Sequence, residues 1–163
     1  MYTKEALLDL NLRAHKNLRD LLDHCRGLSH DELNRSIPGF GLPTVREQLC
    51  HEIGANEYWI GVLLGQMLAD ENLDDYPDID ALEQYRVQVF NMTRDYLDAA
   101  TPQELNTERT MTTWGGKERQ LKPALVVMRT LTHLYHHQGQ VLAMCRILGK
   151  PGGGMDFPII PLD

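Results

Sequence analysis

The stretch Thr132-His133-Leu134-Tyr135-His136-His137 places three histidines within five residues, inside a segment whose apolar residues repeat at helical spacing. Along an α-helix, four residues advance the chain by about 6 Å and rotate it about 40° past a full turn, so His133 and His137 leave the helix on one face. Two imidazoles placed in this way can bind one cation. The spacing therefore predicts a metal site with His133 and His137 as two of its ligands.

A third ligand is expected from another helix. Structural zinc sites usually use four protein ligands, whereas catalytic sites use three and leave the remaining positions to water or substrate. His51 lies on an earlier segment of helical periodicity and is the best candidate for the third ligand. The competing interpretation is that each histidine is hydrogen-bonded or solvated, because an isolated HxxxH spacing is a weak signal.

His136 leaves two assignments open, because it lies three residues after His133 and can share the same helix face. The pair four residues apart, His133 and His137, is the preferred one. His136 would then line the site, or contact a ligand side chain without binding the metal itself. Gln140, one turn further on, could do the same.

Four long amphipathic helices account for most of the chain. Their apolar residues recur at steps of three and four, which buries one stripe of each helix against its neighbours. The expected spans run from Leu7 to Leu28, from Val45 to Leu64, from Leu82 to Ala99 and from Pro123 to Leu148. This pattern is typical of an all-α four-helix bundle.

Shorter elements are expected between these helices. The segments Ser29-His30-Asp31-Glu32 and Thr101-Pro102-Gln103-Glu104 have the spacing of a capping box, which predicts a short helical turn at each. Helical periodicity is lost between Thr107 and Leu121, where threonine-rich alternation around Gly115-Gly116 predicts a small β-hairpin or flap with Trp114 at its tip.

Two further segments are expected to be loops. The acidic segment 70–78 lacks the glycine and the spacing of a calcium-binding loop, so it is expected to be solvated. The tail, residues 152–163, is expected to pack against the bundle through Phe157, Ile159 and Ile160.

Length and composition favour one globular domain, residues 1–163, which can bury roughly 70% of its unfolded surface without disulfides. A formal net charge of −7 argues against nucleic-acid binding. The N-terminus does not resemble a signal peptide, and no apolar run approaches the roughly 20 residues that a bilayer requires, so we expect a cytoplasmic protein. Cys25, Cys50 and Cys145 form no Cys-x-x-Cys pair, and each is expected to be a buried thiol.

Three parts of the sequence together resemble a known family. They are the string Gly39–His51 leading into the second long helix, Trp59 further along it, and His133–Gln140 on the fourth. On these residues the chain resembles the DinB/YfiT-like superfamily of metal-binding four-helix bundles. The likeness extends to the hairpin before the last helix and to Asp156-Phe157 in the tail, and so covers nearly the whole chain.

The resemblance implies that His51, His133 and His137 bind one divalent metal ion per chain. The family usually has arginine where Gln138 stands, which weakens any role for that position without affecting the ligands. Imidazole ligands suit zinc and nickel, our first expectations, and also iron and copper. The likeness, together with apolar residues on more than one helix face, favours a homodimer.

Two functions of different classes follow from these expectations. Family members with known activities act on low-molecular-weight thiols, as thiol S-transferases or thiol-dependent isomerases. The resemblance therefore implies a metal-dependent enzyme that activates a small thiol or water toward an electrophile, with Tyr58, Trp114 and His136 as candidate pocket residues. The alternative is a metal-binding stress-response or interaction protein without turnover. A structural cross-link is a third interpretation, but a bundle with this much core does not require one.

Overall fold

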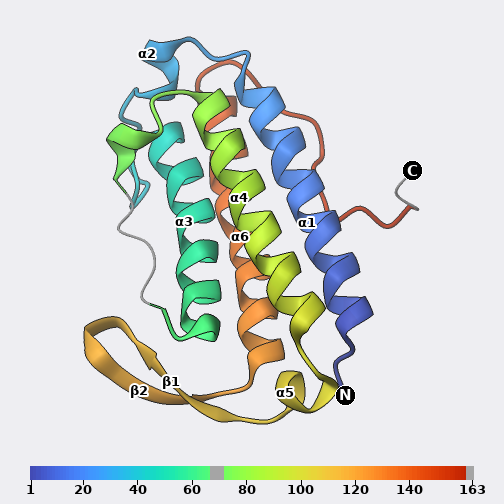
Figure 1. Cartoon of the computed structure of the whole chain (residues 1–163). Coiled ribbons are helices and arrows are strands. Elements are labelled where there is room, and N and C mark those ends of the chain that lie inside the picture. Colours follow the sequence, from blue (N-terminus) through green and yellow to red (C-terminus); the bar gives the residue numbers. More distant parts are fainter. Residues whose placement is uncertain (67–71, 161–163) are drawn as a thin grey trace.

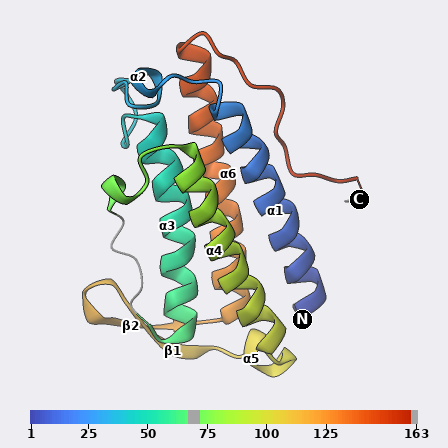
Figure 2. The ribbon, with the colours of Figure 1, turned by 45° about the horizontal axis from the view of Figure 1, so that its top comes forward.

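Four long helices pack side by side into one bundle (Figures 1 and 2). The computed structural model describes residues 1–66 and 72–160. The long helices are α1 (Lys4–Cys25), α3 (Val45–Leu64), α4 (Ile79–Ala99) and α6 (Pro123–Ile147). Both α1 and α3 pack along α4 and α6, so α1 and α3 lie diagonally across the bundle from each other. The predicted all-α four-helix bundle is confirmed.

Shorter elements join the long helices at both ends of the bundle. α2 (His30–Leu33) follows α1, and α5 (Pro102–Asn106) follows α4. Both begin as predicted, because the side chains of Ser29 and Thr101 accept hydrogen bonds from backbone amides in the first turn. A 3₁₀ turn, η1 (Leu73–Asp75), lies within the expected acidic loop, whose first two residues fall outside the described part of the chain.

The predicted β-hairpin lies at the end of the bundle that also holds the N-terminus (Figure 1). Its strands β1 (Arg109–Thr113) and β2 (Lys117–Leu121) are antiparallel and paired over their whole length. The turn between them, η2 (Trp114–Gly116), contains Gly115 and Gly116 at φ of +67° and +70°. Two consecutive left-handed residues are the reason that this turn uses glycine.

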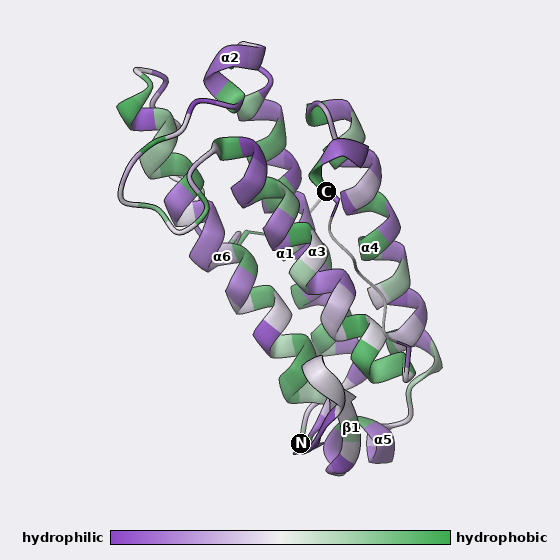
Figure 3. Cartoon of the chain, turned by 90° about the vertical axis from the view of Figure 1, so that its left-hand side faces the viewer, coloured by the Kyte–Doolittle hydropathy of each residue, from purple (hydrophilic) through white to green (hydrophobic). Residues whose placement is uncertain are grey.

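Apolar side chains from all four long helices meet in one core. Figure 3 shows hydrophobic and hydrophilic residues interleaved along the helices, as a stripe pattern requires. α3 is buried over most of its surface, as expected, because it contacts α2 and β1 in addition to α4 and α6. Cys25, Cys50 and Cys145 are buried free thiols, which confirms the interpretation of the cysteines. Within the described residues, no helix is both long and apolar enough to cross a membrane.

The second long helix ends at Leu64, as predicted, because a φ of +71° at Gly65 turns the chain away. The expectation that the tail packs down through its isoleucines is wrong. In the tail, Ile159 and Ile160 are 90% and 70% exposed, so they do not anchor the segment. Phe157 is 37% exposed and packs only loosely.

Hydrogen bonds to the backbone hold the tail in place instead. The Asn17 side-chain amide on α1 donates to the carbonyl oxygens of Met155 and Asp156 at 2.9 and 3.2 Å. Arg13, one turn earlier, donates to the carbonyl oxygens of Pro158 and Ile160 at 2.9 and 2.7 Å. Polar groups of α1 therefore fix the path of the described part of the tail.

One buried polar contact crosses the bundle diagonally. His15 on α1 is 2% exposed, and its Nε2 lies 3.1 Å from the side-chain nitrogen of Asn56 on α3. Burial, and then the charge of Arg86, lower the pKa of His15 to about 3. The ring is therefore neutral in the folded protein and accepts a hydrogen bond from the Asn56 amide.

We predict that acid destabilises the bundle through His15. The ordinary histidine pKa is 6.5 and that of folded His15 is about 3, so between these values only the unfolded chain binds the proton. Stability is then lost as the pH falls from 6.5 toward 3, at up to about 1.4 kcal/mol per pH unit. Urea unfolding of the metal-free protein at about pH 7 and about pH 5 should show a smaller loss for His15→Gln than for the wild type. Equal losses would contradict this assignment.

Candidate metal centre

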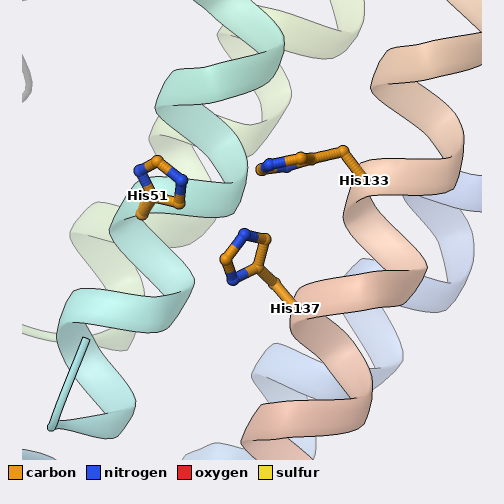
Figure 4. A group of neighbouring side chains, drawn as sticks. All are labelled: His51, His133 and His137. Carbon is orange, nitrogen blue, oxygen red and sulfur yellow. The ribbon is translucent and has the colours of Figure 1, made fainter. Parts of the chain in front are cut away.

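Helix packing brings His51 to the HxxxH pair. A capping box begins α3, with the Thr44 hydroxyl accepting from the Glu47 amide at 3.1 Å, and this start places His51 about two turns into the helix. His133 and His137 lie in the middle of α6, which packs along α3. Figure 4 shows the three rings directed toward one another in the space between the two helices.

His51, His133 and His137, called the three-histidine group below, each offer one ring nitrogen, and these nitrogens all lie within 4.8 Å of one another. The ring centroids are 4.4 Å apart for His133 and His137, 4.8 Å for His51 and His137, and 5.5 Å for His51 and His133. The group could hold a metal ion. Among the described residues, no cysteine, aspartate, glutamate or further histidine joins it.

The chemistry of the donor set fits a divalent ion. Metal–nitrogen bonds of about 2.0–2.1 Å place the nitrogens of a tetrahedral site roughly 3.3 Å apart, so small ring rotations would complete the geometry. The Nδ1 atom of His133 is buried and has no hydrogen-bond partner within the described residues. A buried polar atom without a partner is costly in the free protein, and a metal bound at Nδ1 itself would offset that cost.

Gln48 fixes the orientation of His137. Its Nε2 donates to the Leu42 carbonyl oxygen at 2.9 Å and to Gln140 Oε1 at 3.1 Å, which uses both amide hydrogens. Its Oε1 is therefore the atom that lies 2.6 Å from His137 Nδ1, and it must accept the hydrogen of that nitrogen. His137 consequently keeps the Nε2 lone pair for a metal.

The same chain of hydrogen bonds reaches His136. Gln140 accepts from Gln48 through Oε1, so its Nε2 donates to His136 Nε2 at 2.9 Å. The His136 ring is exposed, with its centroid 6.2 Å from that of His133 and 5.0 Å from that of His137. His136 and Gln140 therefore lie beside the three-histidine group. Neither contributes a nitrogen to the group itself.

Two of the three rings stay neutral far into the acidic range. Burial, followed by the charges of Arg129 and the neighbouring histidines, lowers the pKa of His133 to about 4. Burial and the neighbouring histidines lower the pKa of His137 to about 3. Metals bind the neutral imidazole, so both rings are in the binding form at neutral pH.

Tyr58 and Trp114 hold the hairpin against α3. Their rings are stacked with centroids 3.9 Å apart, and the Tyr58 hydroxyl accepts from the Trp114 backbone amide at 2.8 Å. Tyr58 is 2% exposed, whereas Trp114 is 57% exposed. Tyr58 follows His51 by seven residues, or about two turns, so this pair lies on the hairpin side of the three-histidine group.

Sequence reasoning missed Gln48 as a residue of the site. A signal exists, because Gln48 lies three residues before His51 and so shares part of its helix face. Glutamine at that spacing is too common on helices to have singled it out.

Comparison with known proteins gives a family match and a similar fold. The model of the DinB family matches residues 1–161. A conserved protein from Enterococcus faecalis, known from a crystal structure, aligns with a TM-score of 0.66 over 92% of this chain and 99% of that one. The two sequences are 16% identical, so this likeness concerns the fold alone. No curated protein matches the chain. Because the family model covers nearly the whole sequence, including all three histidines of the group, the chain belongs to the DinB family.

Proposed function

We propose that the three-histidine group binds one divalent metal ion, zinc or nickel first and iron or copper as alternatives, and that the protein is a metal-dependent enzyme acting on a low-molecular-weight thiol. The observation that carries this proposal is the convergence of three ring nitrogens within 4.8 Å from two helices. A bound divalent ion would lower the pKa of a thiol or water enough to supply a nucleophile near neutral pH. We expect a cytoplasmic homodimer with small-molecule partners.

The donor count supports a site that accepts a ligand. Structural zinc sites usually have four protein ligands, and the three-histidine group has three within the described residues. Gln48 sets the tautomer of one ligand, while His136 and Gln140 offer polar groups beside the site for a thiol or an electrophile. A structural cross-link explains these features less well.

A second candidate function is a metal-binding stress-response or interaction protein without turnover. A pocket away from the three-histidine group is the observation that suits a binding role. This cavity of about 550 Å³ lies toward the hairpin end of the bundle, lined by residues such as Leu63, Met92 and Tyr96, away from the three-histidine group. The two functions differ in whether a thiol and an electrophile react faster in the presence of the metal-loaded protein.

We predict one divalent ion per chain, and its loss when any member of the three-histidine group is changed to alanine. Elemental analysis of purified variants measures the metal, and an assay of a thiol with an electrophile measures turnover. Chelation should abolish turnover and metal addition should restore it, with helical content unchanged. Absence of turnover in a protein that holds metal would favour the second function.

Matched controls come from other histidines of the chain. His24→Ala and His30→Ala change residues that lie outside the group and should keep the full metal content.

His136→Ala should keep the metal but bind it more weakly, by about 10-fold to 100-fold, if His136 only supports a ligand. Full occupancy in His133→Ala would refute the ligand assignment.

We predict that Gln48→Leu weakens metal binding by about 10-fold to 100-fold, because it leaves His137 Nδ1 without its acceptor. Gln48→Glu retains an acceptor and should bind metal at least as tightly as the wild type. Isothermal titration with metal measures both affinities. Gln88→Leu, which makes the same change at an exposed glutamine of α4, serves as the control. Wild-type affinity in Gln48→Leu would show that the contact does not orient the ligand.

The lowered pKa values shape the pH dependence of metal binding. Protons compete for His133 and His137 only below pH values of about 4 and 3, since above them these rings are already neutral. Between neutral pH and about pH 5, affinity should therefore fall by at most one proton per metal, or about 10-fold per pH unit. Metal titrations across this range measure the slope. A slope approaching three protons, which three unperturbed histidines would give below about pH 6.5, would contradict the burial of these ligands.

A further inference from the structure

Arg129 presents a fixed guanidinium next to the three-histidine group. It lies four residues before His133 on α6, about one helical turn, and therefore on the same face. Its Cζ atom is 4.8 Å from the centroid of the Trp59 ring on α3. This distance is typical of a cation–π contact, and Trp59 is only 7% exposed, so the ring provides a rigid platform for the exposed arginine.

The Arg129 guanidinium has no protein partner for its hydrogens within residues 1–66 and 72–160. Arg86, in contrast, donates through two nitrogens to the carboxylate of Glu83 at 2.6 and 2.7 Å. The chain has 23 acidic residues and 16 basic ones, so carboxylates for pairing are plentiful. A stacked guanidinium without a carboxylate partner has a planar set of donors ready for an anion.

Arg129 and His133 leave α6 on the same face, one helical turn apart. An anion that binds Arg129 would therefore lie near whatever occupies the three-histidine group. The two residues are offset by about 6 Å along the helix axis, which suits a small molecule that carries its anionic group a few bonds from its sulfur.

We propose that Arg129 binds the carboxylate of a thiol whose sulfur lies at the three-histidine group, so that Arg129 selects thiols that are also carboxylic acids. This inference rests on the proposed function. Arg129 is a specificity-determining residue, with Trp59 as the surface that holds its side chain in place. A bidentate pair with a carboxylate uses the planar geometry of the guanidinium, which a lysine would not reproduce.

The test compares two thiols that differ in the anionic group, 3-mercaptopropionate and 3-mercapto-1-propanol. Each is titrated calorimetrically into the metal-loaded protein, and elemental analysis afterwards checks that the metal is retained. The wild type should bind the acid about 10-fold more tightly than the alcohol, as expected for a charge-assisted pair at a partly exposed site. Arg129→Gln should abolish this preference, and Arg129→Lys should retain part of it.

Arg146→Gln is the matched control, because Arg146 is an exposed arginine in the last turn of the same helix. It should keep the wild-type preference. A purely structural role for Arg129 would change the melting temperature in Arg129→Gln and leave the preference intact, and this result would overturn the subsite. Equal binding of both thiols by the wild type would also overturn it. Binding of neither thiol would instead refute the proposed function, and the subsite would fall with it.

Discussion

The pairing of α3 with α6 is the contact on which the site depends. His51 reaches the other two histidines only because α3 turns the face that carries it toward α6. A rotation of α3 by one residue, about 100°, would direct His51 elsewhere. A buried stripe on α3 fixes this rotation, since Val45, Leu49, Ile53 and Ile60 share one face and are all at most 1% exposed. Hydrophobic packing therefore sets the geometry of a polar site.

Features that depend on spacing within one segment could be predicted from the sequence. The capping box at Thr44 and the HxxxH pair at His133 and His137 involve residues three or four positions apart, where helical geometry alone decides which side chains meet. The choice of His51 as the candidate third ligand drew on the family resemblance as well, because no spacing rule connects two different helices.

Features that depend on how two helices shift against each other could not be predicted. The contact between Gln48 and His137 joins residues 89 positions apart, and an axial shift of α3 by one residue, about 1.5 Å, would break it. The prediction for the tail was wrong for a related reason. Hydrophobicity pointed to Ile159 and Ile160, but the contacts that form use backbone carbonyl oxygens, which every residue carries and which leave no mark in a sequence.

The charge balance of the site bears on what it binds. Three neutral imidazoles leave a divalent ion its full charge of about +2, and Arg129 adds another positive charge nearby. Glu52 follows His51 directly, and burial raises the pKa of its carboxyl group well above the usual range, which disfavours the charged form. Its two oxygens also have no hydrogen-bond partner within the described residues. A ligand with both a thiolate and a carboxylate would neutralise most of this charge, whereas a neutral alcohol or water would leave it uncompensated in a partly desolvated position. With a divalent ion bound, the charges at the site would therefore favour an anionic ligand, whatever the shape of the site.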